Sequence, residues 1–105
     1  MILNATIFAL EGAANAIERR GWTRGATERD GRVCAYRALS LCAGSETRHA
    51  AVNALVEELN LDPGHRRLCM PAILVTEWND RQTDRRKVIR ALRRTARNLR
   101  AAQDA

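Results

Sequence analysis

Hydrophobic residues recur at alternating intervals of four and three along the first twenty positions, which is the spacing of one face of a helix. The stripe consists of Leu3, Ile7, Leu10, Ala14 and Ile17. This pattern predicts a helix that begins near Asn4 or Thr6, either of which can cap it, and ends at Gly21. With Gly21 in the left-handed conformation that follows a helix, Trp22 is expected to fold back on Ile17, as in a Schellman motif.

The next forty residues predict a turn and two more helices. Residues 23–32 are polar, and Asp30-Gly31 favours a tight turn with very short strands on either side. A second helix is expected from Val33 to Ala43, because small apolar residues crowd this stretch and Gly44 ends it. Ser45 can cap a third helix, which the turn at residues 62–64 would end. Its predicted inner face consists of Val52, Leu55, Val56 and Leu59.

The last third predicts a short element followed by a long helix. Pro71 suits a first helical turn, yet residues 72–78 fit either a buried helix or a strand. Asn79 and Asp80 are expected to end this element, and Thr83 is expected to cap the final helix. The buried seam of that helix is predicted to consist of Val88, Leu92, Thr95 and Leu99, flanked by Ile89 and Ala96.

Together these elements predict an all-α fold, a compact bundle of four to five helices in a single domain of residues 1–105, with or without one short β-hairpin near Asp30-Gly31. Hydrophobic residues make up 46% of the chain, which argues against a disordered protein. Aromatic residues make up only 4%, so the core must be built from Leu, Ile, Val and Ala.

Positive charge is concentrated in the final helix. From Arg81 to Ala105 there are nine basic and two acidic residues, a net charge of +7, and the remaining nine basic and ten acidic residues sum to −1. At about 100° per residue the basic side chains cover a continuous arc of about 200°. The predicted partner-binding residues on this arc are Arg86, Arg90, Arg93, Arg94, Arg97 and Arg100. Glu57 and Glu58 of the third helix are candidates to pair with it inside the chain.

This basic face predicts a non-enzymatic interaction module that docks an acidic protein surface. The alternative is a nucleic-acid-binding protein that uses the same face, because phosphate contacts need only cations on one side of a helix. Few residues nearby could read bases, so such binding would be weakly sequence-specific. A solvated or internally paired face is a third interpretation. No membrane partner is expected, because the apolar side lacks Trp and Phe. The oligomeric state stays open, a homodimer included.

The sequence offers no recognisable catalytic or metal-binding pattern. The candidate zinc ligands would be Cys34, Cys42, His49, His65 and Cys69, but their spacings match no compact zinc site. A Cys–His nucleophile pair lacks an orienting acid at a diagnostic spacing. We therefore predict no metal, no cofactor and no enzymatic activity. Three cysteines without a paired motif, and no secretory leader, predict a cytoplasmic protein with buried, reduced thiols.

The string Trp78-Asn79-Asp80 has two interpretations. In the first it forms a corner between two helices, where Trp78 covers the core, Asn79 adopts a left-handed turn and Asp80 accepts backbone hydrogen bonds. In the second it is an exposed interaction patch that grips a partner.

Several short strings together resemble a family of small uncharacterised proteins from GC-rich actinobacteria and their phages. They are Arg20-Gly21-Trp22, Gly31-Arg32-Val33-Cys34, Ala38-Leu39, and Trp78-Asn79-Asp80 followed by Thr83 and Val88. The resemblance implies a small soluble domain of unknown function, an accessory protein of a phage or mobile element, with no catalytic residues to transfer. Arg37 stands where such sequences often have Gly, which puts close packing there in question.

Overall fold

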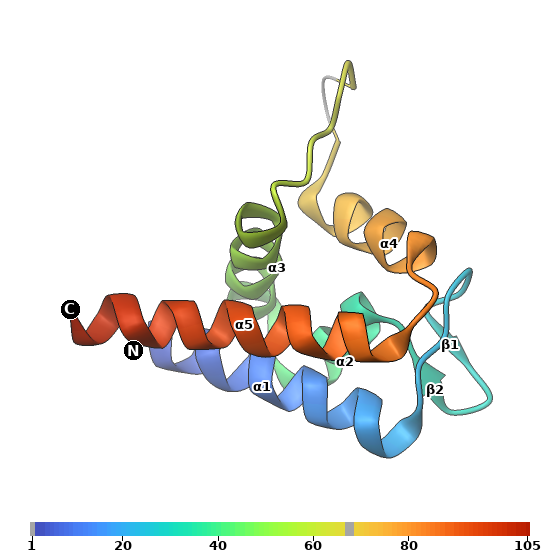
Figure 1. Ribbon diagram of the computed structural model, residues 1–105, viewed down its shortest axis with the longest axis horizontal. Helices are drawn as coiled ribbons and strands as arrows, with labels where there is room; N and C mark the ends of the chain where they lie inside the picture. Colours follow the sequence, from blue (N-terminus) through green and yellow to red (C-terminus); the bar gives the residue numbers. More distant parts are fainter. Residues whose placement is uncertain (1, 67–68) are drawn as a thin grey trace.

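A computed structural model describes residues 2–66 and 69–105 (Figure 1). The elements in chain order are α1 (Ile2–Arg20), β1 (Glu28–Arg29), β2 (Arg32–Val33), α2 (Ala35–Cys42), α3 (Ser45–Leu59), α4 (Pro71–Arg81) and α5 (Arg85–Asp104). The prediction of an all-α fold with one short hairpin is confirmed. Residues 72–78 are helical and not a strand.

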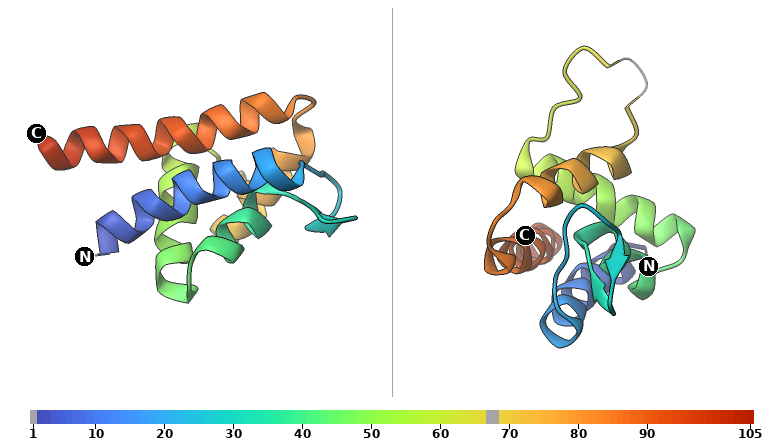
Figure 2. Two further views of the ribbon diagram at one scale, coloured as in Figure 1. Left: turned by 90° about the horizontal axis from the view of Figure 1, so that it is seen from below. Right: turned by 90° about the vertical axis from the view of Figure 1, so that its right-hand side faces the viewer.

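The two longest helices, α1 and α5, lie side by side and run in opposite directions, so the chain begins and ends at the same end of the molecule (Figure 1 and Figure 2). At that end Gln103 Nε2 donates a hydrogen bond to Asn4 Oδ1 at 2.8 Å. The helices meet through their predicted stripes, since Leu10, Ile17, Val88 and Leu92 are all fully buried. The helix α3 crosses this pair and contributes Leu55 to the same core.

The hairpin has the predicted turn. Glu28 pairs with Val33 and Arg29 pairs with Arg32 in an antiparallel ladder. The two central residues, Asp30 and Gly31, have φ values of 53° and 81°. A type I′ turn needs positive φ at both positions, which explains why the sequence uses Asp-Gly.

The ends of α1 differ from the prediction. The helix already includes Asn4 and Thr6, so neither residue caps it. Gly21 does end the helix with φ of 92°, and its N–H donates to Ile17 O at 2.9 Å. That bond defines the simpler left-handed closure and not the Schellman motif. A Cβ at Gly21 would come within 2.8 Å of the Arg32 side chain. The positive φ and this close approach therefore both favour glycine at this position.

The starts of α2 and α3 are also shifted from their predicted positions. Val33 belongs to β2, and Cys34 caps α2, with its thiol accepting from Arg37 N at 3.4 Å. Gly44 and not Ser45 is the cap of α3. Arg37 is half-buried, and its side chain reaches Glu28, whose Oε1 lies 3.2 Å from Arg37 Nε.

The ends of α3 and α4 and the start of α5 also differ from the prediction. The helix α3 ends at Asn60, which has φ of 51°, a conformation that Asn tolerates better than most residues. Neither Asn79 nor Asp80 ends α4, which continues to Arg81. The cap of α5 is Asp84 and not Thr83, since the Asp84 carboxylate accepts from Arg86 N at 2.9 Å.

Candidate interaction site

Ion pairs divide the arginine face of α5. Arg93 Nη1 lies 2.9 Å from Glu18 and Arg100 Nη2 lies 3.0 Å from Glu11, both on α1. On the other side, Arg94 Nε lies 3.1 Å from Glu58 of α3. Three of the six predicted partner-binding arginines are therefore already paired with carboxylates of neighbouring helices.

The sequence pointed to only one of these carboxylates. Glu58 was predicted as an intramolecular partner, whereas no ion pair of Glu57 is found in the part of the chain that the structure describes. Glu11 and Glu18 were missed. They are seven residues apart and so lie on one side of α1, but that signal has meaning only once α1 is known to lie antiparallel to α5.

Amide side chains reinforce the same seams. Asn15 Oδ1 accepts from Arg93 Nη2 at 3.1 Å, and Asn98 Nδ2 donates to Glu58 Oε1 at 2.8 Å. Exposed ion pairs contribute about 0–1 kcal/mol each. Their main effect is therefore to hold the guanidinium groups of Arg93 and Arg94 against the neighbouring helices.

The remaining predicted arginines form what we call the outer ridge: Arg86, Arg90 and Arg97. At 100° per residue these three positions fall within about 40° of one another, on the side of α5 opposite the buried Leu92, and they span about 16 Å along the axis. Arg90 and Arg97 are exposed and make no ion pair within residues 2–66 and 69–105. Arg86 forms an ion pair with Asp84, the cap of its own helix, at 3.3 Å.

Hollows flank the outer ridge on both sides. Between α1 and α5, a hollow of 470 Å³ is lined by Glu11, Asn15, Arg93, Arg97 and Arg100. Toward α4, a hollow of 240 Å³ is lined by Leu59, Trp78, Gln82, Lys87, Arg90, Ala91 and Arg94. The ridge is thus raised between two depressions that also carry cations, and a complementary surface could engage it from either side.

The string Trp78-Asn79-Asp80 forms an internal junction. Trp78 is 9% exposed and Asn79 is fully buried, so the interpretation as an exposed patch is wrong for these two residues. Asn79 Oδ1 accepts from Trp22 Nε1 at 2.8 Å and from Ala35 N at 3.0 Å. Asn79 lies within α4 and not in the predicted left-handed turn.

The other groups of this junction also bind backbone. Asn79 Nδ2 donates to Thr23 O at 3.1 Å. The predicted role of Asp80 is confirmed, because its Oδ1 accepts from Gly25 N at 2.8 Å. The segment after α1, the start of α2 and the end of α4 are therefore held together by two adjacent side chains.

The thiols are not all buried as expected. Cys34 is fully buried, and this burial raises its pKa, whereas Cys42 is exposed and Cys69 is half-buried. His49 and His65 are both exposed. Within the described residues, His, Cys, Asp and Glu side chains form no group of three that could hold a metal ion.

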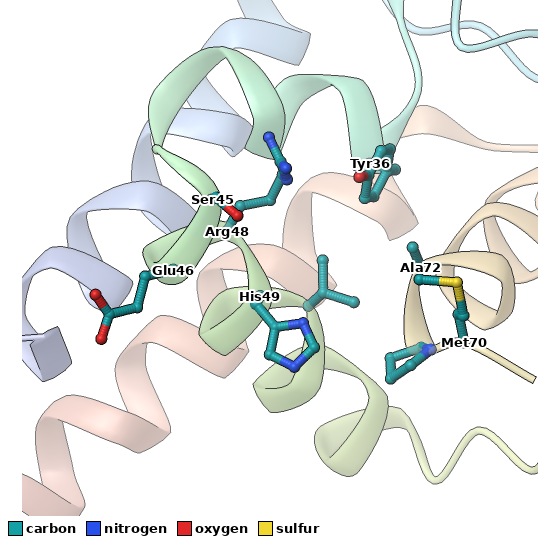
Figure 3. Close-up of a pocket in the computed structure, with 9 residues that line it drawn as sticks. Tyr36, Ser45, Glu46, Arg48, His49, Met70 and Ala72 are labelled. Atoms are coloured by element: carbon teal, nitrogen blue, oxygen red, sulfur yellow. The ribbon is translucent and has the colours of Figure 1, made fainter.

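A third depression lies between α3 and the start of α4 (Figure 3). It has a volume of 410 Å³ and is lined by Tyr36, Ser45, Glu46, Arg48, His49, Val52, Met70, Pro71 and Ala72. We call it the α3–α4 groove. No pattern in the sequence indicated it, because its walls come from three separate segments.

Comparison with known proteins gives a family but no described relative. Neither the curated proteins nor the solved structures contain a match to this chain. In the described part of the chain, no helix is long and apolar enough to cross a membrane. A family model matches residues 1–98, nearly the whole chain, and confirms the predicted relationship to an uncharacterised family. The chain therefore belongs to the family of unknown function DUF6197.

Proposed function

We propose that this protein is a small non-enzymatic interaction module that docks an acidic partner protein through the outer ridge of α5. The observation that carries the proposal is the division of the arginine face. Arg93, Arg94 and Arg100 are tied to carboxylates of α1 and α3, while Arg90 and Arg97 face outward without an ion pair in the described chain.

Like charges in one row repel one another, so they gain when a partner supplies the opposite charge. Internal carboxylates pair with Arg93 and Arg100 on one flank of α5 and with Arg94 on the other, and the ridge lies between them. A partner with separate carboxylates at similar spacing could pair with Arg86, Arg90 and Arg97 without meeting Glu11 or Glu58.

The alternative is that the ridge binds nucleic acid. In its favour, the three arginines lie in one row of about 16 Å, which is an arrangement that phosphate contacts can use. Against it, Glu11, Glu18 and Glu58 flank the row. A duplex carries one charge per about 1.7 Å of its axis, and these carboxylates already hold three of the arginines that its phosphates would need. We therefore favour the acidic protein.

The non-enzymatic part of the proposal is supported by what the reactive groups do. The Cys34 thiol is a buried helix cap, and the Asn79 and Asp80 side chains hold backbone segments together. A role as a cytoplasmic accessory protein of a phage or mobile element belongs to the same proposal. It is supported by the resemblance of the motifs.

Two binding measurements separate the partner classes. Fluorescence anisotropy with a 20-base-pair duplex over a salt series should show feeble binding near physiological salt. Immobilised protein should capture acidic proteins from a nuclease-treated bacterial lysate, and the Arg86→Gln, Arg90→Gln, Arg97→Gln triple variant should not. Tight duplex binding with a steep salt dependence, lost in the same variant, would favour nucleic acid instead. If the variant alters neither binding while remaining folded, the ridge is a solvated exterior.

A further inference from the structure

Large apolar side chains are exposed at the start of α4. Met70 is 62% exposed, and Ile73, three residues later, is 44% exposed. Met70 lines the α3–α4 groove, and Ile73 lines an adjoining hollow of 280 Å³. Clustered exposed apolar side chains around a depression are typical of a protein-binding surface.

The two hollows meet at shared residues. Tyr36 and Ala72 line both of them, so the depression continues from α3 across the first turn of α4. A volume of 410 Å³ with an open extension suits one or two side chains of an extended peptide. Met70 adds an adaptable wall, because a thioether side chain can repack around different apolar groups.

Charge decides which peptide fits the groove. Arg48 and His49 line it from α3, and the Arg48 side chain makes no ion pair within the described residues. His49 points toward α4 across the groove, whereas Glu46 points away from it (Figure 3). Glu77, beside the adjoining hollow, is already held by Arg66 at 2.8 and 3.0 Å. The groove therefore offers an uncompensated cation beside an apolar wall.

We infer that the α3–α4 groove is a second docking surface, which takes a peptide segment of a partner protein that carries an apolar side chain next to a carboxylate. The apolar side chain packs among Tyr36, Val52 and Met70, and the carboxylate pairs with Arg48. The site uses none of the arginines of α5, so it goes beyond the proposed function. It can be tested independently of docking through the outer ridge.

The test is a titration of the ¹⁵N-labelled full chain, followed by amide chemical shifts. The probe is the capped hexapeptide acetyl-Ser-Asp-Leu-Phe-Glu-Ser-amide. One comparison peptide replaces Asp and Glu by Asn and Gln, and a second replaces Leu and Phe by Ser. We expect saturable shifts at His49, Val52 and Ala72, and affinity about fivefold or more weaker for each comparison peptide.

Three variants make the result specific. Arg48→Gln should bind the acidic and the amide peptides equally. Met70→Ser should weaken all binding without harming the fold, because Met70 is the cap of α4 with no side-chain capping bond and Ser caps well. The outer-ridge triple variant should bind the probe in the groove as the original protein does.

Four results would overturn the inference. The groove signals could stay unshifted, the shifts could fall on α5 alone, or the acidic and amide peptides could bind the original protein equally. The fourth is a concentration-dependent shift of the groove signals without peptide that Met70→Ser abolishes, which would make a second copy of this chain the occupant.

Discussion

Asn79 is the residue at which distant parts of the chain meet. Its amide oxygen accepts from Trp22 and from the backbone at Ala35, and its amide nitrogen donates to Thr23. The strings Arg20-Gly21-Trp22 and Trp78-Asn79-Asp80 are therefore two halves of one hydrogen-bonded junction. The sequence showed both strings and offered a structural role as one of two interpretations of the second, but nothing local reveals that an asparagine inside a helix reaches 57 residues back.

Removal of the Asn79 amide should destabilise the protein. Asn79→Ala leaves the Trp22 indole and the Ala35 N–H without an acceptor, so we expect a loss of about 2–5 kcal/mol in the free energy of unfolding. Trp22→Phe should cost less, since Ala35 keeps its acceptor. Urea denaturation measures both. Asn53→Ala, in the middle of α3, is the matched control and should be nearly neutral. An Asn79→Ala protein as stable as this control would refute the junction.

The cysteines should differ sharply in reactivity. Burial raises the pKa of Cys34, while Cys42 is exposed although its pKa is also raised by partial burial. Iodoacetamide followed by mass spectrometry should modify Cys42 in the native protein and Cys34 only after unfolding. Because the folded pKa of Cys34 is raised, its contribution to stability is full below the unfolded value of about 8.5 and is lost as the pH rises through the folded value. Early alkylation of Cys34 would show that α2 opens readily.

At the scale of elements, apolar periodicity predicted the helices well, and capping predicted their ends less well. The stripes of α1, α3 and α5 read directly from spacing, because a helix must bury one face, whereas residues 72–78 fitted a helix or a strand. A cap depends on which of several adjacent polar residues reaches the free N–H groups. Thr83 and Asp84 both qualify by type, and Asp84 is the one whose carboxylate reaches Arg86 N.

The Asp84 cap predicts an effect of pH on α5. Hydrogen bonds from the backbone and side chain of Arg86 lower the pKa of Asp84. Its contribution to stability is therefore present above the unfolded value of about 3.9 and is lost as the pH falls through the lower folded value. Asp84→Ala should lower the melting temperature at pH 7, and the difference should shrink on acidification. Asp84→Asn keeps an acceptor and serves as the control. A pH-independent difference between Asp84→Ala and the original protein would contradict this role.

At the scale of the whole molecule, the concentration of charge in α5 was readable from the sequence, but its division was not. The pairing of Arg93 and Arg100 depends on Glu18 and Glu11, which come near only because α1 and α5 pack antiparallel. The α3–α4 groove was not predicted from the sequence for the same reason, since Tyr36, His49 and Met70 come from separate segments. Surfaces built across elements cannot be found by scanning one element at a time.

Two matched triple variants test the central claim. One replaces the outer ridge by Arg86→Gln, Arg90→Gln and Arg97→Gln, and the other replaces the paired arginines by Arg93→Gln, Arg94→Gln and Arg100→Gln. Each lowers the net charge from +6 to +3, because three positive charges are removed. The measurement is the affinity of each for a 20-residue polyglutamate at physiological salt.

We expect the ridge variant to bind about tenfold more weakly than the original protein. The paired variant should keep most of its affinity and lose a little thermal stability instead, because it removes the ion pairs between α5 and its neighbours α1 and α3. Equal losses of affinity in the two variants would mean that only total charge matters, and a larger loss in the paired variant would place the docking surface elsewhere on α5; either result would contradict the account.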